Sequence, residues 1–256
     1  MSIRSSIACA GLILGMLTGA SVADEPTDVA NEHLLKGRYE EAAEAFAKVL
    51  NDDATNVAAL LGLSRSLESA DRITESRECI NLAIGVVAEN ADLLGRLAEL
   101  QLAAGQLDDA LKSAESAIKL DDDHMRARMV QARVQVESGD LETADTSFRW
   151  FVRYYNRKQP EDAESLLMVG EGAVEYARWH SVSSIFNFIV NTLCPDALKD
   201  EPDSWQAHFV SGSRLLEKYN RAEALPDLEK ALTINPRAVE VIVKLGEVAL
   251  QQHDIS

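Results

Sequence analysis

The residue types that most often carry catalysis or bind metals are scattered through this sequence. None of the histidines belongs to a His-Glu-x-x-His motif or has a cysteine or second histidine at zinc-site spacing: His33, His124, His180, His208 and His253. Gly170-Glu171-Gly172 lacks the third glycine of a dinucleotide-binding loop, and no Gly-x-x-x-x-Gly-Lys or Gly-x-Ser-x-Gly sequence occurs. The sequence therefore predicts no catalytic residue, no metal site, no cofactor and no enzyme activity.

The composition is that of a globular chain with a strongly acidic surface. Of its 256 residues 46% are hydrophobic and 26% charged, and the formal net charge is -17. Such a charge repels nucleic-acid phosphates and anionic membrane surfaces, so we expect no nucleic-acid partner. The many carboxylates are interpreted as solvated helix faces.

The elements that position these side chains follow a repeat with a period of about 34 residues. Left-handed helix ends are predicted at the four anchors Gly37, Asp71, Gly105 and Gly139. The second position after each anchor is large and apolar, and we expect it to plug a helical hairpin: Tyr39, Ile73, Leu107 and Leu141. A small residue stands at the fifth position after each anchor and lets two helices approach closely: Ala42, Ser76, Ala110 and Ala144.

Apolar positions complete the buried stripe of each hairpin. At the ninth position after the anchors stand Phe46, Ile80, Ala114 and Phe148, and the preceding helix of the second unit carries Leu60, Leu63 and Leu67. Polar links such as Asn51-Asp52-Asp53 and Asp121-Asp122-Asp123 are predicted to cap the helices that follow them. Cys79 and Cys194 are far apart in this order, so we expect no disulfide, and Cys79 is expected to be buried.

These residues resemble the tetratricopeptide repeat family, whose period is also about 34 residues. The clearest single unit has Gly212, Ala224, Leu228, Ala231 and the closing Asn235-Pro236. The resemblance implies an all-α fold, an α-solenoid of antiparallel helical hairpins, over residues 24–256. Units start near residues 23, 57, 91, 125, 163 and 205, with a partial unit from 239, and an excess stretch around Thr192 to Asp203 is predicted to be a loop.

In this family the first helix of each unit lines a concave groove that holds a peptide or protein partner. By position, the resemblance implies that this groove presents Arg65, Arg126, Met129, Arg133 and Phe209. A guanidinium there can clamp a carboxylate through two hydrogen bonds, whereas the alternative is that the arginines pair with neighbouring acids. The family subtype that clamps acidic chaperone tails is not expected, since Asn31 and Arg96 match its pattern but Thr27, Gly62 and Asp92 do not.

Basic and aromatic residues alternate between Phe148 and Lys158. Arg149, Arg153 and Arg157 are spaced by four, with Trp150, Phe151, Tyr154 and Tyr155 between them. Such a run can bind nucleic acid or a membrane surface. Packing within a hairpin, with cations suited to a helix C-terminus, is the favoured interpretation in an acidic chain.

Residues 1–23 have the pattern of a secretory signal peptide. Arg4 precedes an apolar run from Ile7 to Ala20, and Ser21-Val22-Ala23 offers a cleavage site before Asp24. The run is too short to span a bilayer, so we expect an exported, periplasmic or extracellular chain without a stable membrane span after cleavage; the alternative is an uncleaved anchor.

Three functions are compatible with these features. The leading one is an exported scaffold that binds a peptide or protein on its concave groove. The second is the targeting or regulatory array of a larger enzyme, such as a metallopeptidase, with a catalytic domain beyond residue 256; the third is a spacer that only sets distance. The abrupt end after Ile255 is the feature that favours the second. The helix from Val239 is apolar on more than one face, which fits the front part of a longer protein or a helix covered by a partner, and simple packing on the sixth unit with scattered exposed valines explains it equally well.

Overall fold

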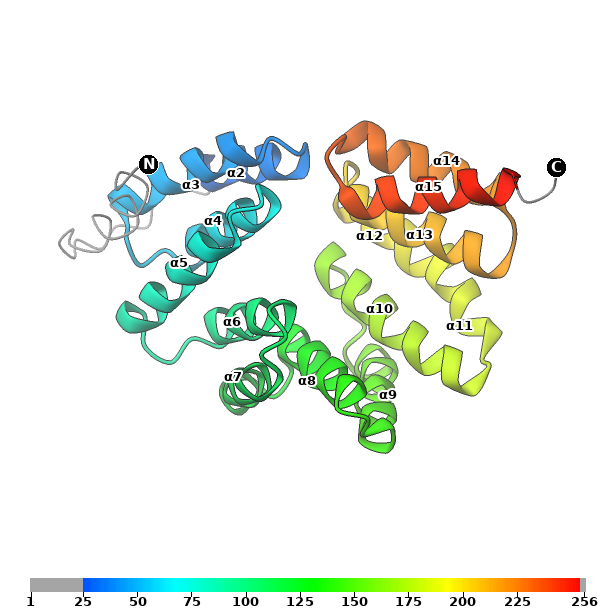
Figure 1. Ribbon diagram of the computed structural model, residues 1–256, viewed down its shortest axis with the longest axis horizontal. Helices are drawn as coiled ribbons and strands as arrows, with labels where there is room; N and C mark the ends of the chain where they lie inside the picture. Colours follow the sequence, from blue (N-terminus) through cyan, green and yellow to red (C-terminus); the bar gives the residue numbers. More distant parts are fainter. Residues whose placement is uncertain (1–24, 254–256) are drawn as a thin grey trace. The chain divides into compact units, whose positions relative to one another are not determined.

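A computed structural model describes residues 25–253 of the chain, and the regular elements of this range are helices (Figure 1). The helices fall into two compact units, which are described separately. The first unit holds residues up to 34 and 38–140, and the second holds residues 35–37 and those from 141 onward. The predicted signal peptide lies outside the described residues, and no described helix combines the length and apolarity needed to cross a membrane.

The first unit is a succession of antiparallel helical hairpins. Its helices are α2 (Glu25–Leu35), α3 (Tyr39–Asp52), α4 (Val57–Ser69), α5 (Ile73–Val86), α6 (Ala91–Ala103), α7 (Leu107–Leu120) and α8 (Met125–Glu137). Each helix packs mainly on its neighbours in sequence, and α4, α6 and α8 also contact one another in order. The all-α hairpin architecture predicted from the repeat is confirmed.

The anchors of the repeat end helices in the left-handed conformation, as predicted. The φ angles are 72° at Gly37, 60° at Asp71, 71° at Gly105 and 79° at Gly139. At Asp71 the next amide, of Arg72, donates to the carbonyl of Leu67 at 2.8 Å, which closes the last turn of α4. Three of the four anchors are glycines because this conformation costs other residues about 1–2 kcal/mol.

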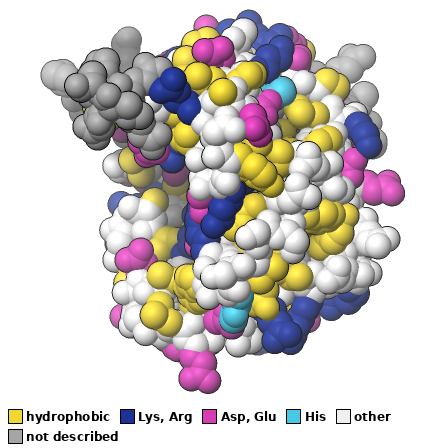
Figure 2. Space-filling view, turned by 90° about the vertical axis from the view of Figure 1, so that its right-hand side faces the viewer, with side chains coloured by type: hydrophobic (Ala, Val, Ile, Leu, Met, Phe, Trp, Pro, Cys, Tyr) yellow, Lys and Arg dark blue, Asp and Glu magenta, His cyan; other side chains and the backbone are white. Residues whose placement is uncertain are grey.

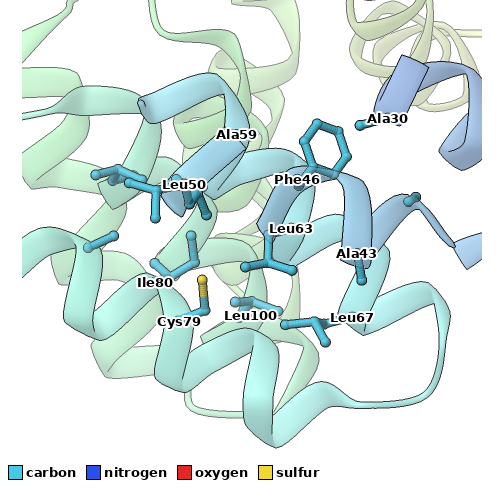
Figure 3. Packing of buried hydrophobic residues seen from close by; sticks show 14 residues of the cluster. Ala30, Ala43, Phe46, Leu50, Ala59, Leu63, Leu67, Cys79, Ile80 and Leu100 are labelled. Atoms are coloured by element: carbon cyan, nitrogen blue, oxygen red, sulfur yellow. The ribbon is translucent and has the colours of Figure 1, made fainter. Parts of the chain in front are cut away.

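The small and apolar positions behind the anchors form the core. Figure 3 shows Phe46 of α3 among Ala30, Leu63 and Ala43, with Cys79 and Ile80 contributed by α5. Gly62 of α4 allows this packing, since a Cβ atom on it would lie 2.2 Å from Cζ of Phe46. The close approach of α3 and α4 therefore depends on one glycine facing one ring.

Two predictions about the hairpins are wrong. Of the residues expected to fill the hairpins, Tyr39 is buried and Leu107 is half-buried against its core, whereas Ile73 is 49% and Leu141 55% exposed. The side chains that cap helices stand directly before them and not in the links at residues 51–53 and 121–123. Asn56 accepts the capping bond from the amide of Ala59 at 3.0 Å, and five further residues cap their helices in the same way: Asn90, His124, Asp162, Ser204 and Asn220. Asp53 and Asp121 instead close turns within their own links.

The helices of the second unit vary more in length than those of the first. They are α9 (Leu141–Lys158), α10 (Ala163–His180), α11 (Ser183–Phe188), α12 (Cys194–Asp200), α13 (Trp205–Lys218), α14 (Arg221–Ile234) and α15 (Val239–His253). Phe148 and Phe151 of α9 are buried, and Trp150 stacks with Tyr154 at 4.9 Å between ring centroids. The aromatic residues of the basic run thus pack within the unit.

The predicted loop around Thr192 to Asp203 is wrong over most of its length. The chain continues from α11 through a π-helical turn, η2 (Ile189–Leu193), into α12, and only residues 201–204 are non-helical. Pro195 stands at the start of α12, directly after the π-helical turn, and the chain remains helical through it. The side chains of Ile189 and Leu193 are buried against α10, where a Cβ atom on Gly170 would lie 3.6 Å from each of them. This segment therefore takes the place of the second helix of the fifth hairpin.

Candidate functional site

The first helices of three successive hairpins carry the charged cluster of the first unit. Arg65 on α4, Glu99 on α6 and Arg133 on α8 occupy equivalent positions of successive repeats, so their charges alternate. Asp92 and Arg126 are also one repeat period apart, near the starts of α6 and α8. Because α4, α6 and α8 contact one another, these side chains can interact across helices.

Arg96 is the buried centre of the cluster. Its side chain is only 5% exposed. Nε donates to the Oγ atom of Ser64 at 2.9 Å, and the two terminal nitrogens donate to Glu68 at 2.6 Å and Glu99 at 3.1 Å. Ser64 is itself held by Ser76 of α5 at 2.8 Å. Arg96 therefore joins α4 to α6 through bonds that a buried guanidinium needs.

Glu99 receives hydrogen bonds from two arginines. One carboxylate oxygen accepts from Arg96, and the other accepts from Arg126 of α8 at 2.8 Å. Burial acts to raise the pKa of Glu99, but Arg126 and Arg96 outweigh it, so that the pKa is lowered overall. Glu99 therefore stays ionised and fixes the position of the Arg126 guanidinium.

Arg65 lies where a positive charge is poorly stabilised. Burial and the nearby Arg126 lower the pKa of Arg65 to about 10, and Glu99 offsets them only in part. A lowered pKa means that the charged guanidinium is less stable in the folded chain than in water. An anion placed beside Arg65 and Arg126 would be attracted to both.

Asp92 and His124 form the edge of the cluster. Nδ1 of His124 accepts the capping bond from the amide of Ala127 at 3.1 Å, so Nε2 carries the hydrogen and donates to Asp92 at 3.2 Å. This hydrogen bond lowers the pKa of Asp92. Gly95 makes room for the ring, since a Cβ atom there would lie 2.3 Å from Cε1 of His124.

The predicted site residues do not all lie together in the structure. The structure brings Arg65 and Arg126 together, and Arg133 is exposed on the same helix as Arg126. Met129 is only 4% exposed, so its side chain fills the core and offers no accessible pocket. Phe209 belongs to the second unit, where it is half-buried against the cores around Leu228 and Val241.

Arg96 belongs to the cluster although the sequence does not predict it there. Its position matches a chaperone-tail pattern that the chain otherwise lacks, which gives no reason to group it with Arg65 and Arg126. The available signal is an arginine inside the otherwise apolar sequence Leu93-Leu94-Gly95-Arg96-Leu97, which requires a buried acidic partner.

The second unit has a comparable but smaller network between α10 and α13. Arg178 donates to both oxygens of Glu217, at 2.9 and 2.8 Å, and Arg214 donates to the same carboxylate at 2.9 Å. The bond from Arg178 lowers the pKa of Glu217, while burial and Arg178 lower that of Arg214. The carboxylate of Glu217 thus accepts hydrogen bonds from both arginines, and its bonds with Arg178 join α13 to α10.

Two further histidines, His180 and His208, link helices. His208 lies 3.0 Å from Asp227, and His180 lies 2.6 Å from Asp145. Within the part of the chain that the structure describes, no three or more histidine, cysteine, aspartate and glutamate side chains are grouped to hold a metal ion.

Comparison with known proteins agrees with the repeat. Family models of the tetratricopeptide repeat match residues 33–85 and 96–144. Among solved structures, a chain of the Cut9–Hcn1 hetero-tetramer of the APC/C has a TM-score of 0.53 at 16% identity, covering 84% of this chain and 41% of that one. No curated protein matches.

Two bacterial structures are also similar. Pseudomonas aeruginosa pilF has a TM-score of 0.48 at 12% identity, with 88% of this chain and 96% of that chain covered. A tetratricopeptide repeat protein of Thermus thermophilus has a TM-score of 0.47 at 16% identity, with 89% and 98% covered.

Proposed function

Because residues 33–85 and 96–144 are tetratricopeptide repeats, we propose that the chain is an exported interaction scaffold. It holds a peptide or protein partner on the face formed by α4, α6 and α8 of its first unit. Arg65 and Arg126 bind a carboxylate of that partner, either a side chain or a chain end.

The observation that carries this proposal is the charge cluster itself. Burying ions costs free energy that their mutual attraction often fails to recover, so a helical stack does not require them. In this unit the guanidinium groups of Arg96 and Arg126 are held by hydrogen-bonded carboxylates, and the guanidinium of Arg65 is close enough to interact with Arg126 and Glu99. Such an arrangement costs stability and is expected where it recognises a ligand.

The geometry suits a carboxylate ligand. Arg96 is enclosed and has its donors engaged, so it positions Glu99 and does not bind the partner. Arg126 is held by Glu99 through one terminal nitrogen and is 20% exposed. A carboxylate approaching Arg65 and Arg126 would relieve the repulsion that lowers the pKa of Arg65 and accept charge-assisted hydrogen bonds.

The test compares two double variants on one peptide array. Arg65→Gln with Arg126→Gln should reduce binding of carboxylate-containing peptides at least tenfold. Arg72→Gln with Arg128→Gln is the matched control, since these arginines lie in the same unit but pair with Glu75 and Asp122 away from the cluster. Equal binding by both variants would refute the site, and an array without any selective binding would favour a spacer.

Export rests on residues 1–23. Expression in a bacterium with a general secretion system should give a chain whose first residue is Asp24, as determined by mass spectrometry of the purified protein. Ala23→Arg should block this processing. A chain that keeps Met1 after fractionation would support an uncleaved anchor or no export.

A further inference from the structure

The outer face of α15 exposes a continuous apolar stripe. Val239, Ile242, Val243 and Leu250 follow helical spacing and are 48–70% exposed, with Gly246 between them. The opposite face, through Val241, Leu245 and Val248, packs in the cores around α13 and α14. Figure 2 shows hydrophobic side chains at the surface among charged ones on the side of the molecule that includes part of the second unit. The stripe of α15 is therefore additional to the face that holds the helix in place.

The same positions are covered in the preceding hairpin. His208, Gly212 and Leu216 of α13 stand one repeat period before Ile242, Gly246 and Leu250. Helix α14 covers them: Asp227 binds His208 at 3.0 Å, and a Cβ atom on Gly212 would lie 2.8 Å from Leu228. Leu216 packs against the same core. The stripe of α15 thus has the pattern by which a first helix receives its second helix.

Gly246 gives independent support for a close-packed helix. The equivalent residues of five preceding units are small and buried: Ser64, Ala98, Ala132, Gly170 and Gly212. Ser64, Gly170 and Gly212 each face the second helix of their own hairpin. A Cβ atom on Gly246, in contrast, would meet nothing within 4 Å. Gly246 therefore leaves room for the backbone of another helix at the position where Gly212 of α13 admits α14.

The charges beside the stripe favour a basic helix over a second copy of this chain. Glu240 and Glu247 are exposed and flank one side of the stripe, and Lys244, which pairs with Glu247 at 2.7 Å, lies away from it. In an antiparallel pairing of two copies, these glutamates would face each other and repel. A helix with lysine or arginine beside its apolar face would instead be attracted.

We propose that α15 docks an amphipathic helix of a different protein in the place that α14 takes on α13. The docked helix presents a small residue to Gly246 and a large apolar residue one turn later, as Ala224 and Leu228 do towards Gly212. It carries basic residues next to Glu240 and Glu247. This surface lies on the second unit and is distinct from the arginine cluster of the first.

The test uses the full chain and a synthetic helix as probe. The probe has the sequence of residues 220–235 with Pro226→Ala to favour the helix, Asp227→Ala because this position faces the equivalent of Ile242, and lysine at the exposed acidic positions Glu223 and Glu229. Isothermal titration should detect binding to the unchanged chain and at least tenfold weaker binding to Gly246→Leu, whose side chain fills the docking position. Gly85→Leu is the matched control, because Gly85 also lies exposed in a helix with nothing within 4 Å of a Cβ position.

A second variant separates docking from folding. Glu240→Lys with Glu247→Lys leaves the packed face of α15 unchanged. It should weaken binding of the lysine probe and strengthen binding of a probe that keeps the acidic residues. Equal binding of the lysine probe to the unchanged chain and to Gly246→Leu, or no binding at all, overturns the proposal. A concentration-dependent dimer in sedimentation that Gly246→Leu abolishes also overturns it, in favour of a second copy.

Discussion

At the scale of single residues, the arginines of the first unit divide into two kinds. Arg96 is enclosed and makes bonds to Ser64, Glu68 and Glu99, so it is part of the structure. Arg65 has a lowered pKa because burial and Arg126 disfavour its charge. Substitution of Arg96 should therefore lower stability, whereas substitution of Arg65 should weaken ligand binding without lowering stability.

Arg96→Met should lower the free energy of unfolding by about 3–5 kcal/mol, because it removes the buried guanidinium that donates to Glu68 and to one of the two carboxylate oxygens of Glu99. Arg72→Met, which removes an exposed pair with Glu75, should cost no more than about 1 kcal/mol. Urea denaturation followed by circular dichroism measures both. A loss for Arg96→Met as small as that of the control would show that the cluster is not a buried network.

Arg65→Met should leave the free energy of unfolding unchanged or raise it, since the charged form of Arg65 is disfavoured in the folded chain. The same substitution should weaken binding of carboxylate-containing peptides on the peptide array described above. A large loss of stability would instead mean that Arg65 is a structural residue like Arg96. Thermal denaturation of the purified variant distinguishes these outcomes.

Acid should weaken the first unit through the same carboxylates. The pKa of Glu99 is lowered from its ordinary value of 4.5 and that of Asp92 from 3.8, so each binds fewer protons in the folded than in the unfolded chain. Their contribution is therefore complete above those ordinary values and is lost as the pH falls through the lowered ones. In urea melts between pH 7 and pH 3, Glu99→Gln should flatten the decline in stability below pH 4.5. An unchanged slope would contradict this assignment.

At the scale of elements, the repeat spacing predicts the fold much better than the site. Anchors such as Gly105, small residues such as Ala110 and core residues such as Phe46 depend on local geometry, which recurs in every repeat unit. The bonds of Arg96 depend on which side chains three different helices bring together, and no periodicity contains that information. The π-helical turn at Ile189–Leu193 does not follow from the sequence because Cys194-Pro195 also fits a loop.

The left-handed helix ends give a test of local geometry. Asp71 has φ of 60° where the other anchors are glycine, so Asp71→Gly should raise stability by up to about 1 kcal/mol. Gly105→Ala should lower it by about 1–2 kcal/mol for backbone reasons alone, since nothing lies within 4 Å of a Cβ position there. Gly85→Ala, in the last turn of α5, is the control and should be stabilising. If all three changes had the same sign, the helix ends would not be as described.

At the scale of the whole molecule, stability is distributed over separate cores. The cluster around Phe46 is built from helices α2 to α6 of the first unit, and the cluster around Leu228 from α13, α14 and α15 of the second. Each helix packs mainly on its sequence neighbours, as in other repeat proteins. Stability in such an array is a sum of local terms, so damage to one core is expected to remain largely in its own unit.

Two large-to-small substitutions test this distribution. Phe46→Ala and Leu228→Ala each remove a fully buried side chain and should cost about 3–5 and 2–5 kcal/mol respectively. Hydrogen exchange followed by mass spectrometry should show that Phe46→Ala lowers protection mainly in α3 to α6, and Leu228→Ala mainly in α13 to α15. Uniform loss of protection along the chain in both variants would mean that the two units unfold as one cooperative body. Retained protection in one unit would let the arginine cluster and the α15 stripe be tested independently, because damage to one surface would leave the other folded.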